Sequence, residues 1–578
     1  MQRASGNGPL ARPSRRLLSL FCVFAIPIAT QAQFPIPDTA PQFRNAWDEL
    51  PEWLNTGLPF DAQAYFAIDP VENREPLYLA AFVEFDYSLA PQFYAETWEG
   101  PENQARRDET RLRRQRVVAC LDALGNRANT SSLIVDENKE QLREVLREVM
   151  APFKIGLQRL EEAQKRPRCF FHPEVDSSSA PLHLYIGRQI GDVLTIRALL
   201  DLGSDQPCRN ARIGLQLKRD LIPLADQLTQ HINVQFEEVV LKRTVRPLLE
   251  KPDLSDDHLR ELTSLLKKHY LENRSIDPAI QAERYEYLML RNLLHQLQTG
   301  QYAEEAAERS ESIGFDRELS VPELLLRELT ALGSYEVNSD YMESYLRELA
   351  VEDSRMQRAL DILNQGKRLE DKLDPLERMS LSAKIQEAGL APILLSQLPG
   401  MTAEDYDTEV QMLNRRYQQI EAACQKPYPD AYFDLRILDH AWTIDDSWKN
   451  GKLLKWFQLN RLVSLSRCRT TIQTGAYLCL TAAKQWQRKY RELPTQNMAA
   501  AMAEIGVDHV PIDPFSGESL KFRQDGADLI IYSVGPDQRD DNAELFFNLF
   551  DSPRNNPDKD PGDVVYRFRI GSDPTTSQ

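Results

Sequence analysis

Apolar residues recur with the period of an α-helix over most of the chain between residues 104 and 498. Near residue 145 they fall at i, i+3, i+4 and i+7, which places Leu142, Val145, Leu146 and Val149 on one helix face. Between 182 and 202 apolar side chains cover much of the helix surface, a pattern typical of a buried helix. The residues 203–207, with Gly203 and Pro207, then break the helix, and a second one is expected to begin near Cys208.

Local signals predict where several of these helices begin and end. Ser255 is a suitable N-cap, and Asp256 and Asp257 follow it in the first turn, where negative charge is favourable. Pro494 ends a helix expected over 453–491. The segment 300–306 resembles the turn of a tetratricopeptide-like hairpin, but the chain has no fixed repeat period. These patterns predict a mostly α protein whose body is an irregular multi-helix bundle or α-solenoid.

The pattern changes to that of strands near the C-terminus. Apolar and polar residues alternate before Asp525-Gly526, a strong signal for a β-hairpin, and the return strand is expected over 529–533. A third strand, 564–570, places Val564, Tyr566, Phe568 and Ile570 on one face. We therefore expect a small antiparallel β module after the long helix, the two together forming a unit over 453–578.

The N-terminus has the pattern of an export signal. Arg12, Arg15 and Arg16 precede an apolar run, Leu17–Ala29, that is too short to span a bilayer, and Thr30-Gln31-Ala32 provides small residues for cleavage. The division that follows is a signal peptide over 1–32, an arm over 33–103, a helical body over 104–452 and the C-terminal unit. We expect a periplasmic or cell-envelope protein; the alternative is a protein that stays membrane-anchored through an uncleaved N-terminal segment.

The arm is rich in proline and aromatic residues and has little helical period. Two interpretations are open for its aromatic side chains: they line a groove for a peptide or glycan, or they are anchors that hold the arm on the body. The residues concerned are Trp47, Trp53, Tyr65, Tyr87, Tyr94 and Trp98.

The charge balance bears on the partners. The formal net charge is −18, and the first 32 residues contain four arginines and no acidic residue, so the remainder is more acidic still. A negative field repels phosphate backbones, which excludes nucleic acid as a partner and disfavours an anionic membrane surface. Membrane contact is expected only through an uncleaved N-terminal segment, and the partners we expect are proteins of unknown identity.

Six cysteines remain after the signal segment, an even number that permits three disulfides in an oxidising compartment. Small apolar core residues are the other interpretation, and zinc binding is disfavoured because no two of them have C-x-x-C spacing. Cys468 and Cys479 are expected on one helix, too far apart to pair with each other.

No catalytic motif is found in the sequence. The eight histidines form no His-Glu-x-x-His pattern, and neither a Gly-x-Ser-x-Gly elbow nor a phosphate-binding Gly-x-x-x-x-Gly-Lys-Ser/Thr loop is present. Because active sites assemble from distant residues, this lowers the expectation of an enzyme without excluding one. No catalytic or cofactor-binding residue is predicted.

Two C-terminal segments, 513–520 and 531–537, resemble the head of type II secretion pseudopilins and, more closely, large uncharacterised secreted helical proteins typical of planctomycetes. The segments 73–79 and 196–203 resemble the same large proteins. In pseudopilins a loop at this place holds calcium, which implies Asp537, Asp540 and Asp541 as Ca²⁺ ligands here, with Asp558, Asp560 and Asp563 further along. The chain lacks the paired glycines of that loop and inserts 545–550, so a solvated acidic loop is the alternative.

The function expected is that of an exported, non-catalytic helical scaffold or binding protein. One alternative is a hydrolase of envelope polymers with its site between helices, which desolvated Asp, Glu and His side chains in one cleft would favour. The other is a component associated with a secretion system, which calcium binding and assembly by the C-terminal module would favour.

Overall fold

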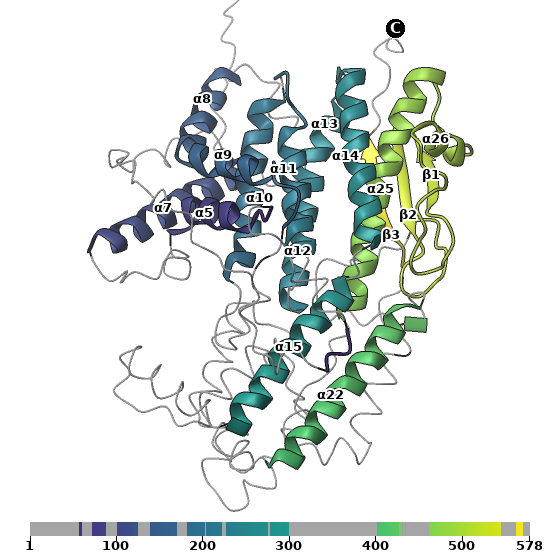
Figure 1. Ribbon diagram of the computed structural model, residues 1–578. Coiled ribbons are helices and arrows are strands. Elements are labelled where there is room, and N and C mark those ends of the chain that lie inside the picture. Colours follow the sequence, from purple (N-terminus) through teal and green to yellow (C-terminus); the bar gives the residue numbers. More distant parts are fainter. Residues whose placement is uncertain are drawn as a thin grey trace, which may run out of the picture.

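The protein is a bundle of helices with a small antiparallel sheet at one side (Figure 1). The computed structural model describes residues 57–60, 72–87, 101–124, 139–169, 171, 182–202, 204–221, 227–251, 253–275, 278–299, 402–426, 430, 431, 434, 462–544 and 562–569. The N-terminal segment 1–32, most of the arm, the turn at 300–306 and residues 453–461 lie outside these ranges. The mostly α fold with a C-terminal β module is confirmed, and the division into segments stays a prediction.

The first helices of the described part come from the arm and the N-terminal half of the body. They are α5 (Glu75–Phe85), α7 (Pro101–Ala123), α8 (Lys139–Met150), the 3-10 turn Ala151–Phe153, α9 (Lys154–Ala163), α10 (Leu182–Asp201) and α11 (Arg209–Asp220). The later helices are α12 (Gln227–Val240), the π-helical turn Leu241–Val245, α13 (Arg246–Glu250), α14 (Asp256–Ser275), α15 (Pro278–Thr299), α22 (Ala403–Cys424), α25 (Leu462–Tyr490) and α26 (Met498–Glu504).

The long helix α25 joins the body to the sheet. It contacts α12, α14 and α15 on the body side and strand β2 on the other, and α14 and α25 run side by side in Figure 1. On the opposite side of the bundle α5 packs on α9, and α7 and α8 pack on α10. Helices α15 and α22 pair with each other and extend away from the rest (Figure 1). Residues more than two hundred positions apart therefore meet along α25.

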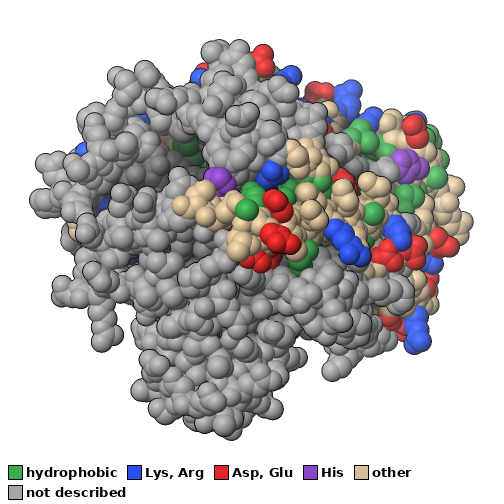
Figure 2. Space-filling model, turned by 60° about the horizontal axis from the view of Figure 1, so that its bottom comes forward, with side chains coloured by type: hydrophobic (Ala, Val, Ile, Leu, Met, Phe, Trp, Pro, Cys, Tyr) green, Lys and Arg blue, Asp and Glu red, His purple; other side chains and the backbone are tan. Residues whose placement is uncertain are grey.

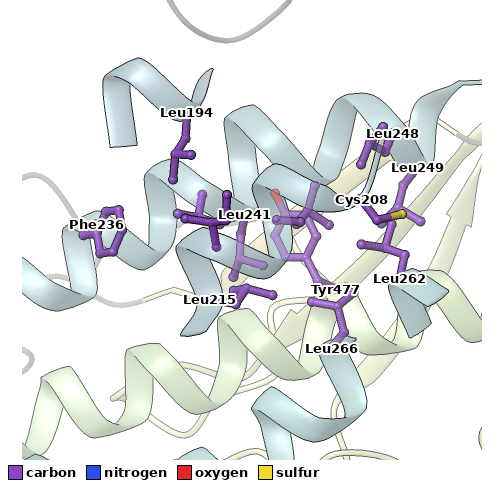
Figure 3. Packing of buried hydrophobic residues seen from close by; sticks show 14 of the residues in the cluster. Leu194, Cys208, Leu215, Phe236, Leu241, Leu248, Leu249, Leu262, Leu266 and Tyr477 are labelled. Carbon is purple, nitrogen blue, oxygen red and sulfur yellow. The ribbon is translucent and has the colours of Figure 1, made fainter. Parts of the chain in front are cut away.

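One hydrophobic core runs through the body and the sheet. A single cluster of buried residues extends from Tyr78 to Phe568, and Figure 3 shows its central part, where side chains of α10, α11, α12, α14 and α25 meet. The apolar residues predicted to bury α10 are all 0–2% exposed: Ile186, Ile190, Val193, Leu194 and Ile196. The helical period thus identified the core face of this helix correctly.

The predicted helix start at Ser255 is present. The backbone N–H of His258 donates to Ser255 Oγ at 3.2 Å, so the serine satisfies one of the free amides of the first turn of α14. Helix α25 was predicted to end near residue 491, and it ends at Tyr490. The next residue, Arg491, has a left-handed φ of 64°, and Pro494 follows three residues later.

The sheet has the order β1-β2-β3, all antiparallel, with β1 at Lys521–Asp525, β2 at Asp528–Ser533 and β3 at Val564–Arg569. Asp525 pairs with Asp528 across the predicted hairpin turn, and Gly526 supplies the positive φ of 59° that the turn requires. Phe568 of β3 packs edge-on against Tyr477 of α25 at 5.2 Å between ring centroids. The inward face predicted for the third strand is therefore the one that meets α25.

None of the six described cysteines forms a disulfide. Five of them are buried and Cys169 is partly exposed. The structure therefore agrees with the interpretation that the cysteines are small core residues, and not with three disulfides. Cys468 and Cys479 both lie on α25 and do not pair with each other, as predicted.

Candidate functional site

The most desolvated charged groups of the body meet between four helices. Lys218 of α11, Glu237 of α12, His269 of α14 and Thr474 of α25 are each 0–1% exposed. Lys218 Nζ lies 2.8 Å from Glu237 Oε2, His269 Nε2 lies 3.0 Å from Oε1, and Thr474 Oγ1 donates to Oε1 at 2.6 Å. We call these four residues the interhelical cluster.

The charge states in the interhelical cluster follow from burial and pairing. Burial by itself raises the pKa of Glu237, but Lys218 and His269 beside it outweigh burial and lower that pKa, so the carboxylate stays ionised. Burial lowers the pKa of His269 to about 4 in spite of the hydrogen bond to Glu237, so the imidazole is neutral near pH 7. Burial also lowers the pKa of Lys218, which Glu237 partly opposes. The cluster therefore pairs an ionised carboxylate with Lys218 and with a neutral histidine.

An acid, a base and a hydroxyl in contact have the composition of a catalytic site, but this one is closed. A substrate atom has to come within about 3 Å of a catalytic group, and these side chains have almost no exposed surface. What the cluster does is connect α11, α12, α14 and α25 through a single carboxylate. Sequence reasoning missed it because its members span 218 to 474; the available signal was a Lys and a Glu inside otherwise apolar helix faces.

A second buried ion pair fastens the start of α5 to the end of α11. Arg74 Nη1 donates to both oxygens of Asp220, at 2.7 and 2.9 Å, and the hydroxyl of Tyr78 donates to Asp220 Oδ2 at 2.6 Å. Arg74 Nε also donates to the carbonyl of Arg166 at 2.6 Å. Burial raises the pKa of Asp220, while Arg74 and Tyr78 oppose that rise. The segment 73–79, which resembles part of the large secreted helical proteins, thus has a structural role. Its residues Arg74 and Tyr78 bind Asp220 and so attach the arm to the body.

The predicted metal ligands lie in the loop that follows β2. Asp540 Oδ2 is paired with Lys521 Nζ at 2.8 Å, and its Oδ1 accepts from Tyr532 at 3.2 Å and from the amide of Asn542 at 3.0 Å. Asp537 Oδ1 accepts from the amide of Arg539 at 3.2 Å. A calcium ion bound by Asp540 would have to displace the Lys521 side chain, which would lower the affinity for calcium. This pairing could not be predicted from the sequence.

The backbone amide of Asp541, and not its carboxylate, contacts Asp563. Asp563 is fully buried and accepts from the amides of Ala543, at 2.6 Å, and Asp541, at 3.5 Å. Burial raises the pKa of Asp563 to about 6, and the nearby Asp540 adds to the rise. Within the described ranges no three His, Cys, Asp or Glu side chains are grouped so as to hold a metal ion. Asp558 and Asp560 lie outside those ranges, and the calcium site stays a prediction.

Asp513 is the other fully enclosed carboxylate of the module. It accepts from the amides of Phe515 and Val534, at 3.0 and 2.9 Å, and from the hydroxyl of Ser533 at 2.7 Å. These bonds fix the turn-rich segment 513–517 to the end of β2. Gly535 follows with a φ of 70°, and a Cβ there would meet the Gly562 carbonyl oxygen at 2.0 Å, so only glycine fits.

The described aromatic residues of the arm act as anchors. Tyr87 is 7% exposed, and its hydroxyl accepts from Arg106 at 2.8 Å. The ring of Phe60 contacts Tyr287 of α15 and Tyr417 of α22, with centroids 5.6 and 5.2 Å away. A small pocket between these helices is lined by Glu283, Tyr287, Leu290, Leu413, Arg416 and Tyr417. The other aromatic residues predicted for the arm (Trp47, Trp53, Tyr65, Tyr94 and Trp98) lie outside the described ranges.

No helix of the described part has the length and apolar character needed to cross a membrane. Comparisons of the chain with protein families, with curated proteins and with solved structures found no match.

Proposed function

We propose that the chain is an exported helical scaffold or binding protein of the periplasm or cell envelope, without a catalytic step of its own. The observation that carries the proposal is the closure of the interhelical cluster. Desolvated acid and base groups in an open cleft would favour a hydrolase, whereas here Glu237, Lys218 and His269 are 0–1% exposed and contact one another. Their ion pair and hydrogen bonds, together with that of Thr474, connect α11, α12, α14 and α25.

The surface and the shared core support the same role. On the face shown in Figure 2, the described acidic and basic side chains lie interspersed and do not gather by sign. Because α25 packs on both the body and the sheet, the two parts share one hydrophobic core. A shared core suits a protein that positions partners, since parts already held together lose little conformational entropy on binding.

The test is affinity capture of the tagged chain from native envelope extract, with the bound proteins identified by mass spectrometry. One or two partners present in stoichiometric amounts are expected. The same chain carrying Glu237→Leu loses the interhelical cluster and is expected to release the partners because its helices are less stably packed. Recovery of the intact chain without any stoichiometric partner would count against the scaffold role and favour the hydrolase alternative.

A further inference from the structure

Helix α7 carries a charge opposite to that of the chain. Between Pro101 and Ala123 it contains six arginines, no lysine and four acidic residues, in a protein with a net charge of −18. The acidic residues are Glu102, Asp108, Glu109 and Asp122. The arginines are Arg106, Arg107, Arg111, Arg113, Arg114 and Arg116. The helix lies at the edge of the molecule in Figure 1.

One side of α7 packs against the rest of the protein, and Thr110, Val117 and Cys120 are buried there. Two of the six arginines make contacts with described residues close to this side. Arg106 bonds to Tyr87, and Arg113 is paired with Glu109. These contacts account for the inward side of the helix and leave the outward side unexplained.

Arg107, Arg111 and Arg114 form the outward row, in which Arg111 and Arg114 are exposed and Arg107 is half-buried. Their spacing of i, i+4 and i+7 places them on one helix face, and Arg107 and Arg114 are about 10 Å apart along the axis. The Arg111 side chain is 73% exposed and pairs only with Asp108, itself 50% exposed, while Arg107 and Arg114 have no acidic partner among the described residues. Like charges at these spacings destabilise a helix, so the row does not serve the stability of α7.

We propose that this outward row of α7 binds a short, carboxylate-rich peptide segment of a partner protein. Arginine presents a planar fork of donors that matches a carboxylate in a two-bond geometry, and all three positions are arginine. A long polyanion would meet the acidic remainder of the chain and be repelled, whereas a short acidic segment meets only the helix. The inference rests on the proposed binding role and specifies the chemistry of the partner.

The test measures binding of fluorescein-labelled hexaglutamate to the full chain by fluorescence anisotropy, at about 20 mM and about 200 mM salt. Binding that weakens with salt is expected. In the triple variant Arg107→Gln, Arg111→Gln and Arg114→Gln, affinity is expected to fall about tenfold, because three partly exposed charge pairs are lost. The triple Arg→Lys variant keeps the charge but loses the fork and should show an intermediate affinity.

The matched control replaces Arg168, Arg212 and Arg260 by Gln, three arginines of 56–70% exposure that each pair with an acidic residue elsewhere. This variant has the same net charge as the α7 triple and should bind like the parent chain. Equal weakening in both triples, equal binding of hexaglutamine, or salt-sensitive self-association in place of peptide binding would each overturn the proposal. If capture from envelope extract fails while hexaglutamate still binds through α7, the scaffold role is wrong and the binding face stands.

Discussion

The body and the C-terminal module both bury a carboxylate completely, but they satisfy it with different partners. In the body, the partners of Glu237 are side chains that come from three other helices: Lys218, His269 and Thr474. In the module, Asp513 accepts mainly from amides and a hydroxyl at the ends of strands and turns, including those of Phe515 and Val534.

The reason for the difference is where free backbone donors exist. Inside a helix every amide is already bonded to the carbonyl four residues earlier, so a buried carboxylate there needs a side chain to pair with it. A turn that leaves a strand has amides without such partners, and a carboxylate can bind two or three of them. The comparison predicts that the body depends on ion pairing between distant helices, and the module on local hydrogen bonds.

The largest effect is expected from Glu237→Leu. It leaves the Lys218 ammonium buried without its counter-charge, and breaking a buried pair in this way costs about 3–5 kcal/mol of unfolding free energy. Adding Lys218→Met should recover most of the loss, because the unpaired charge is then removed as well. Urea unfolding of the two variants measures both values. A double variant no more stable than the single one would mean that the ion pair is not what the site depends on.

In the module, Asp513→Ala should cost about 2–4 kcal/mol, because several buried donors lose a charged acceptor. The effect should be local: hydrogen exchange read by peptide mass spectrometry should rise over 511–535 and stay unchanged in α10. Equal loss of protection in α10 would show that the module and the body respond as one unit to this change.

Acidification should separate the two regions, since two of their groups have pKa values shifted in opposite senses. The pKa of His269 is lowered from 6.5 to about 4, so its contribution to stability is present above pH 6.5 and is lost as the pH falls through 4. That loss is at most about 3 kcal/mol, and protonation of Glu237, whose pKa is also lowered, adds to it at lower pH. Asp563, with a pKa raised from 3.8 to about 6, contributes stability below pH 3.8 that is lost as the pH rises through 6.

The expected result is that hydrogen exchange, corrected for the intrinsic effect of pH, shows α12 and α14 losing protection between pH 6.5 and 4 while β3 gains it. His269→Gln, which cannot titrate, should flatten the response of the helices, and Asp563→Asn should flatten that of the strand. Parallel loss of protection in both regions would contradict the opposite signs assigned to these two groups.

The smallest effect concerns a single donor within the module. Ser533→Ala removes the hydroxyl that donates to Asp513 and is expected to cost about 1 kcal/mol, since Ser533 is fully buried. Ser516→Ala is the matched control: Ser516 is exposed and lies 3.3 Å from the same carboxylate, so its loss should stay within about 0.5 kcal/mol. Thermal unfolding of the two variants resolves the difference, and equal shifts would mean that burial of the donor does not matter here.

Local sequence patterns were enough to predict several elements and their buried faces. Helical period located the core side of α10, Ser255 marked the start of α14, and Asp525-Gly526 marked the hairpin that β1 and β2 form. These features depend on residues within one or two turns of one another, and local spacing is what a sequence displays directly.

Which charged side chains meet depends on packing between distant segments. Lys218, Glu237, His269 and Thr474 are separated by up to 256 positions, and nothing in their local neighbourhoods selects them from the other charged residues of the chain. The acidic loop is a second example: its resemblance to the pseudopilin loop implies calcium ligands, and the pairing of Lys521 with Asp540 is visible only in the fold. Pairing of charges is set by how helices and strands pack at a distance, and that packing follows from the whole core at once.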